Sequence, residues 1–188
     1  MNGAVSFPLD LGELSITASG GSLVRRTVLP SGVRILSEQV AGSQSATVGF
    51  WVAVGSRDEQ PVKYGSTHFL EHLLFKGTPS RTALEIAVSF DQVGGEHNAM
   101  TAKEYTCYYA KVRDQDLPMA VAVLADMFTS SVIDPEEFES DRGVILEELA
   151  MADDDPSDVV SERFFEGIFG RHPLGRPIGG SPASISAV

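Results

Sequence analysis

The chain has 188 residues, of which 43% are hydrophobic and 21% charged, a balance typical of a globular protein and not of a disordered or fibrous one. Its formal net charge of −12 disfavours nucleic acid as a partner and is compatible with a basic peptide. No apolar run approaches the roughly 20 residues that cross a bilayer, so no membrane partner is expected. Cys107 is the only cysteine, which excludes an internal disulfide and favours a reducing, cytoplasmic setting.

The first predicted elements are strands. Residues 1–22 are rich in Gly, Ser and Ala without periodicity and are expected to form a flexible leader. Residues 24–30 and 33–40 are β-rich runs separated by a Ser-Gly pair, a pattern typical of a hairpin. Residues 46–55 form a nearly continuous apolar run, which predicts a strand inside a sheet.

A histidine motif follows the loop expected over residues 56–64. Residues 65–78 read GSTHFLEHLLFKGT and contain His68, Glu71 and His72 in an H-x-x-E-H arrangement. At about 100° of turn per residue, a helix places both histidines on one face and the carboxylate on a neighbouring edge. Such a pair of imidazoles suits zinc, which in catalytic sites takes three protein ligands and leaves a position for water. Glu71 is then free to act as general base, and the residue order is that of inverted zinc peptidases.

The same motif also has a simpler interpretation. Two histidines at helical spacing occur as ordinary polar residues, and a short pattern arises by chance. The flanking residues favour the metal site, because they make the helix apolar nearly all round and so predict burial. Three ionisable groups on a buried helix are costly unless a metal satisfies them. The apolar flanks are Phe69, Leu70, Leu73, Leu74 and Phe75.

Beyond the motif, helices and strands alternate. A Ser-Pro pair at residues 181–182 signals the start of a last helix only six residues before the end, which predicts that the polypeptide is a piece of something longer. The other predicted elements are a helix at 81–93, strands at 96–101 and 105–112, and helices that begin near 117 and 157.

The missing third ligand is expected on the helix predicted over residues 134–152, which has an Asp cap and a Pro in its first turn. On a helical wheel, the apolar face of this helix is centred within about 60° of Glu148, whereas Glu147 points nearly opposite. Glu148 is therefore predicted to face the interior, although the pattern also fits a residue at the edge of the packed face. Asp141 lies two turns earlier on the same side, where a carboxylate would hold a ligand histidine in the right tautomer.

Three stretches in this order resemble a known family: HFLEHLLFKGT, GGEHNAMTAKEYTCYYAKV and DRGVILEELAM. They are similar to the M16 family of zinc metallopeptidases, which includes pitrilysin, insulysin and the mitochondrial processing peptidase, and they resemble the bacterial processing-peptidase-like members in particular. The likeness runs from about Arg25 to the C-terminus. It implies one zinc ion per chain, held by His68, His72 and Glu148, with Glu71 as the base.

The resemblance also implies supporting and substrate-binding residues. Asp141 stands where the family often has a longer Glu beside the metal ligands. Asn98 and Ala99 would contact the backbone of a peptide that adds to an edge strand, because the free N–H and C=O groups of such a strand bind extended chains. His97 departs from the apolar residue expected there, and we interpret it as strand surface and not as a fourth ligand.

The expected fold is α+β, a mainly antiparallel sheet covered by helices on one face. Residues 1–22 are assigned to the leader and residues 23–188 to one N-terminal catalytic, zinc-binding domain. Complete family members are longer, so the C-terminal half is expected to be absent, which would leave the isolated piece weakly active or inactive. The partners implied are a peptide substrate, that missing half or a second subunit, and a second copy in a homodimer.

Two other functions remain open beside the zinc endopeptidase. The chain is also compatible with a non-catalytic scaffold or substrate-holding subunit, although such members of the family usually have broken metal motifs. The third reading is a lyase resembling S-ribosylhomocysteine lyase, which carries H-x-x-E-H and completes its metal site with cysteine. Cys107 is the only candidate for that ligand.

Overall fold

The computed structural model describes residues 13–188, which form two compact units divided after Gln44. The first unit contains an antiparallel sheet of order β1-β2-β3. The predicted hairpin is confirmed as β2 and β3, and Gly32 in their connection has a φ of 88°, a conformation that favours glycine. The strands are β1 (Glu13–Thr17), β2 (Leu23–Val28) and β3 (Arg34–Gln39).

Strand β1 falls within the stretch that was expected to be a flexible leader. Residues 1–12 of that stretch lie outside the described residues. Residues 13–17 pair with β2, with Ile16 opposite Val24. Their sequence, ELSIT, alternates over only five residues, which is too short a run for the strand pattern to stand out. The division after Gln44 also differs from the domain boundary expected after residue 22.

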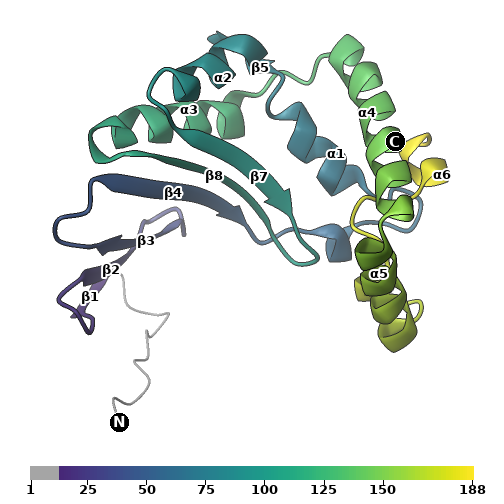
Figure 1. The fold of residues 1–188 in the computed structure, drawn as a ribbon, viewed down its shortest axis with the longest axis horizontal. Coiled ribbons are helices and arrows are strands. Elements are labelled where there is room, and N and C mark those ends of the chain that lie inside the picture. The colour runs from purple at the N-terminus through teal and green to yellow at the C-terminus, as the bar shows by residue number, and fades with distance from the viewer. Residues whose placement is uncertain (1–12) are drawn as a thin grey trace. The chain divides into compact units, whose positions relative to one another are not determined.

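The second unit is built on an antiparallel sheet of order β4-β8-β7. Helices α2 (Ala83–Asp91) and α3 (Leu117–Ser130) cover one face of this sheet (Figure 1). Alternate residues of β8 pack with these helices in the main core, whereas Tyr109 and Lys111 are exposed on the opposite face. The α+β class with helices on one face is therefore confirmed. The strands are β4 (Ser45–Val52), β7 (Glu96–Thr101) and β8 (Thr106–Arg113).

Within residues 13–188, β4 lies at the edge of its sheet, so the prediction that it lies inside a sheet is wrong. Its residues alternate between half-buried and exposed. Val48 and Phe50 pack against the core, but Trp51 is 66% exposed, with its ring centroid 5.2 Å from that of Tyr105. The run is nearly continuously apolar because Trp51 lies on the exposed face of the strand, and not because both faces of the strand are buried.

Helices α1 (Ser66–Leu73) and α4 (Pro135–Asp154) pack against each other, and α1 also packs against β7 (Figure 1). The side chain of Asp134 accepts hydrogen bonds from the first backbone N–H groups of α4, and Pro135 opens its first turn, as predicted. The two helices share a second small core, made of Phe69, Leu73 and Ile145 and completed by Ile185 from later in the chain.

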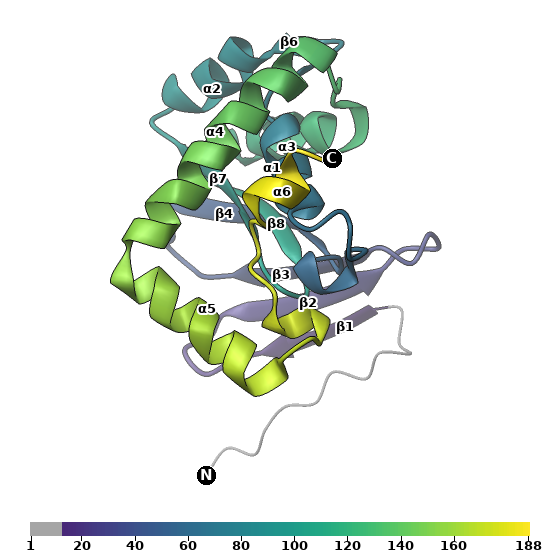
Figure 2. The same ribbon diagram turned by 90° about the vertical axis from the view of Figure 1, so that its right-hand side faces the viewer.

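The remaining elements are short or follow α4. Helix α6 (Pro182–Ile185) lies beside α4 (Figure 2) and is capped by the Ser181 side chain, which confirms the predicted helix start. None of the described helices is by itself long and apolar enough to cross a membrane; Asp114–Ser130 and Pro135–Asp154 meet those criteria only together, with a 103° bend. The other elements are β5 (Gly77–Thr78), β6 (Arg81–Thr82) and α5 (Pro156–Phe169).

Candidate metal centre

The start of α1 is fixed by a side-chain cap. The Glu59 carboxylate accepts hydrogen bonds from the backbone N–H groups of Gly65 (2.9 Å) and Thr67 (2.7 Å), which satisfies two donors at the helix N-terminus. Gly65 has a φ of 86°, and a Cβ atom there would lie 2.3 Å from the carbonyl oxygen of Gly179. Only glycine therefore suits this position, and the cap and the turn together set the direction of His68 one turn later.

The structure brings three of the predicted side chains together. The Nε2 atoms of His68 and His72 are 3.3 Å apart, and their rings meet edge to face at 82°. Glu148, on α4, places Oε2 3.4 Å from the Nε2 atom of His72 and 3.8 Å from that of His68. One ligand atom from each residue lies within 4.8 Å of the others. Glu148 thus points toward the histidines, but its side chain is 45% exposed, so it lies at the edge of the packed face and not in the interior as predicted.

The donor set fits zinc. Two ligands placed about 2.0–2.1 Å from a tetrahedral metal are about 3.3 Å apart, which matches the two Nε2 atoms. His68 Nδ1 is buried and has no hydrogen-bond partner among the described residues. Burial, and next the charge of His72, lower the pKa of His68 and favour the neutral imidazole that binds metals. The Glu148 side chain remains 45% exposed, so the cluster is open to solvent on one side.

Glu71 lies beside the cluster and is itself buried. Its Oε2 atom accepts a hydrogen bond from the hydroxyl of Thr101, the last residue of β7. Both residues line a cavity of about 370 Å³, together with His68 and Glu148. No sequence motif links Thr101 to Glu71, because the contact joins residues that lie far apart in the chain, and no local pattern marks Thr101 as functional.

Asp141 is buried on α4, but its ion pair is with a lysine. Its Oδ1 atom lies 2.6 Å from the Nζ atom of Lys76, and among the described residues no hydrogen bond joins it to His68 or His72. Lys76 lies three residues after the end of α1, and its side chain reaches the carboxylate that was expected to hold an imidazole. In this structure the ion pair of Asp141 therefore links the segment just after α1 to α4.

The Lys76–Asp141 ion pair is predicted to stabilise the folded chain. Lys76→Met would leave the Asp141 carboxylate, which is 1% exposed, without its counter-charge. We expect the free energy of unfolding to fall by about 3 kcal/mol, the scale of breaking a buried ion pair. Urea unfolding of this variant, with the exposed Lys63→Met as control, measures the loss. Equal stability of the two variants would contradict a structural role for the pair.

The predicted substrate strand is an edge strand. β7 pairs with β8 on one side and with no other strand in the described part of the chain. The side-chain Oδ1 of Asn98 accepts a hydrogen bond from the N–H of Ala99 at 2.8 Å. His97 is half-buried and stacks on Phe90, with centroids 4.4 Å apart and planes 16° apart. The interpretation of His97 as strand surface is therefore wrong: it alternates with the exposed residues of β7 and packs on α2.

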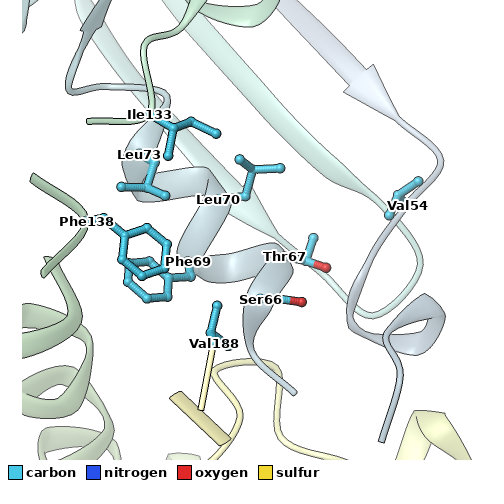
Figure 3. A pocket seen from close by; sticks show the side chains of 9 residues that line it. All are labelled: Val54, Ser66, Thr67, Phe69, Leu70, Leu73, Ile133, Phe138 and Val188. Carbon is cyan, nitrogen blue, oxygen red and sulfur yellow. The ribbon is translucent and has the colours of Figure 1, made fainter. Parts of the chain in front are cut away.

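A second cavity, of about 340 Å³, lies on a different side of α1. Figure 3 shows the rings of Phe69 and Phe138 stacked at its edge, with centroids 4.4 Å apart, and Leu70 and Ile133 beside them. Leu70 is 44% exposed here, so α1 is buried on part of its circumference and not all round as predicted. This apolar side carries no titratable group among its lining residues.

Two imidazoles four residues apart, a carboxylate from a neighbouring helix and a buried acid beside them are the groups that a zinc-peptidase centre requires. Comparison with known proteins agrees with this class. The chain belongs to peptidase family M16, the insulinase family, whose family model matches residues 34–181.

The chain is similar to longer bacterial proteins. It is 54% identical over 169 residues to a protein of Streptomyces coelicolor named an uncharacterized zinc protease, covering 90% of this chain and 37% of that protein. It is 44% identical over 165 residues to the Bacillus subtilis protein YmxG, also named an uncharacterized zinc protease, covering 88% and 40%. The chain thus spans well under half the length of these relatives.

Solved structures share the fold. A protease from Helicobacter pylori matches with a TM-score of 0.82 and 28% identity over 88% of this chain and 40% of its own. Pitrilysin matches with a TM-score of 0.79 and 26% identity over 94% and 20%. A Pseudomonas fluorescens structure described as an M16 inactive domain has a TM-score of 0.78 over 88% and 40%, but at 15% identity it shows likeness of fold alone.

Proposed function

We propose that this chain is the zinc-binding part of a metalloendopeptidase that hydrolyses bonds in extended peptides. The observation that carries the proposal is the convergence of the His68, His72 and Glu148 donor atoms beside the buried carboxylate of Glu71. These three residues would hold one zinc ion per chain and leave a fourth position free. Membership of family M16, and relatives named zinc proteases, support the same function.

The proposed chemistry assigns one role to each group. When bound, zinc would supply positive charge that polarises a carbonyl and makes water more acidic. Glu71 takes a proton from the attacking water as the water oxygen bonds to the carbonyl carbon, and it returns that proton to the amide nitrogen as the C–N bond breaks. The single acid thus serves first as base and then as proton donor. Glu148 contributes a negative ligand and no proton transfer.

The free edge of β7 is the proposed binding site for the peptide. An extended chain added beside this strand would bond to backbone groups, which gives affinity with little dependence on side chains. The Ala99 N–H now bonds to the Asn98 side chain, so an incoming peptide would replace that contact. Because the chain spans 37% of its Streptomyces relative, we propose that a further polypeptide completes the substrate site: C-terminal residues, a second subunit or a second copy of the chain.

The function is tested by measuring zinc content and peptide hydrolysis on the same samples. The chain would be assayed alone and mixed with the part of the Streptomyces coelicolor relative that it does not match. We expect one zinc per chain, and hydrolysis that a chelator stops and added zinc restores. A chain without zinc at neutral pH, even after zinc addition, would contradict the proposal.

The same assay separates the enzyme from a substrate-holding scaffold. The fold alone does not distinguish the two functions, because one fold can carry both active and inactive proteins. Full zinc occupancy with no hydrolysis in either sample would support that alternative. Hydrolysis only in the mixed sample would instead support an enzyme whose site needs the second polypeptide.

The lyase alternative needs Cys107 as a metal ligand, and its position disagrees with that role. Cys107 is 2% exposed, and its Sγ atom would meet a Cβ atom on Gly49 of β4 at 3.4 Å. Burial raises the pKa of its thiol, which disfavours the thiolate that binds zinc. We therefore expect Cys107→Ala to keep its full zinc content, measured by atomic absorption. Loss of zinc from this variant would instead support the lyase hypothesis.

A further inference from the structure

We propose that Thr101 is a positioning residue for Glu71, an inference that rests on the function proposed above. The Thr101 hydroxyl donates a hydrogen bond to Oε2 of Glu71. Thr101 is 8% exposed and Glu71 9% exposed, so little water competes for this bond. The contact joins the end of β7 to the last turn of α1.

The alternation of β7 aims Thr101 at the helix. Met100 is exposed, whereas Ala99 and Thr101 lie on the side of the strand that packs against α1. The register pairs Thr101 with Thr106 of β8, which fixes its height along the sheet. As a β-branched residue, threonine has few side-chain rotamers, so its hydroxyl is held in a narrow range of directions. The strand therefore presents one oriented donor to the carboxylate.

This bond distinguishes the two carboxylate oxygens of Glu71. Oε2 accepts the Thr101 hydrogen, and Oε1 makes no hydrogen bond to another described residue. A glutamate side chain has three torsions, and a hydrogen bond to one oxygen restricts the orientations that the carboxylate can take. Oε1 is then the atom left to take the proton from water. Thr101 acts here through Glu71 and touches no reacting atom itself.

The position of Thr101 also links the base to the substrate. Ala99, two residues earlier on β7, belongs to the free edge proposed to bind the peptide backbone. One strand would therefore hold both the peptide and the carboxylate that acts on the water attacking it. Because misplacement of reacting groups by about 1 Å can cost about 100-fold in rate, a shared strand is a direct way to keep that distance constant.

A matched pair of threonines allows the test. Thr106 is also buried, but its hydroxyl donates to the carbonyl of Val54 at 2.9 Å and not to the base. Thr101→Val removes the positioning hydroxyl at nearly constant shape, Thr101→Ser keeps it, and Thr106→Val removes the neighbouring hydroxyl. Thr101→Ala serves as a second hydroxyl-free variant if the valine prevents folding. Zinc content, steady-state kinetics and crystal structures are measured for each zinc-loaded variant.

We expect Thr101→Val to lower kcat about 10–100-fold, the scale for residues that support a catalytic group, with KM and zinc content kept. Thr101→Ser should restore kcat, and Thr106→Val should leave it unchanged. In the crystal structures, the Glu71 carboxylate should leave its position in Thr101→Val and keep it in Thr101→Ser.

Two results would overturn the inference. The first is a Glu71 carboxylate that stays in place in Thr101→Val, and the second is a loss of zinc and stability equal in Thr101→Val and Thr106→Val, which would indicate a purely structural hydroxyl. Failure of the proposed function is recognised separately. If the unsubstituted chain binds zinc but hydrolyses nothing, the function fails, and the position of Glu71 in the two Thr101 structures still decides the role of Thr101.

Discussion

Glu71→Gln should reduce peptide hydrolysis by about 10²–10⁴-fold, the usual contribution of a general base, while zinc stays bound. The amide keeps the size and the hydrogen bond acceptor that meets Thr101, but it takes no proton from water. Glu71 also lies outside the three-residue donor cluster, so its loss leaves the metal ligands intact. The measurement is kcat/KM on a model peptide, with zinc quantified on the same sample.

Two outcomes would count against this assignment. Undiminished hydrolysis by Glu71→Gln would mean that another group accepts the proton. Loss of zinc together with activity would mean that Glu71 supports the metal and not the water. A fall in activity at constant zinc content, with unchanged unfolding in urea, would support Glu71 as the proton acceptor and exclude both of these outcomes.

Glu148→Ala should lose zinc, because it removes one of three donor groups. We expect the zinc dissociation constant to rise by more than the roughly 10–100-fold that loss of a supporting residue costs. Glu147→Ala is the matched control. Glu147 is adjacent to Glu148 and is also exposed on α4, but it belongs to no donor cluster in the described part of the chain. Competition with a chromogenic chelator measures both constants.

Glu147 and Glu148 can be compared directly, because both are glutamates on the same helix. Unchanged zinc affinity in both variants would show that Glu148, which is 45% exposed, lies near the histidines without binding the metal. Equal loss from both would point to a general effect of charge on α4. Only a selective loss from Glu148→Ala agrees with a ligand at that position.

Local patterns predicted the elements well. The spacing of His68 and His72 follows from helix geometry, and the cap at Asp134 follows from its side chain, so both could be anticipated residue by residue. The wheel of α4 distinguished Glu148 from Glu147 because a helix relates sequence position directly to direction. The edge position of β7 was predicted from the family resemblance and agrees with the sheet order.

Contacts between distant segments could not be predicted from the sequence. Asp141 was expected beside an imidazole, but Lys76 lies closer, and which cation reaches a buried carboxylate depends on packing between two helices. Thr101 gave no signal, since its partner is set by strand register and not by spacing. β4 was misplaced because an apolar run does not reveal whether its outward side chains are covered.

The most direct test of the metal centre is anomalous diffraction at the zinc absorption edge from crystals of the zinc-loaded chain. We predict one strong peak, with the Nε2 atoms of His68 and His72 about 2.0–2.1 Å from the zinc ion and a Glu148 oxygen about 2.0–2.2 Å from it. A peak elsewhere in the chain, or zinc bound by the two histidines with the Glu148 carboxylate turned to solvent, would contradict it.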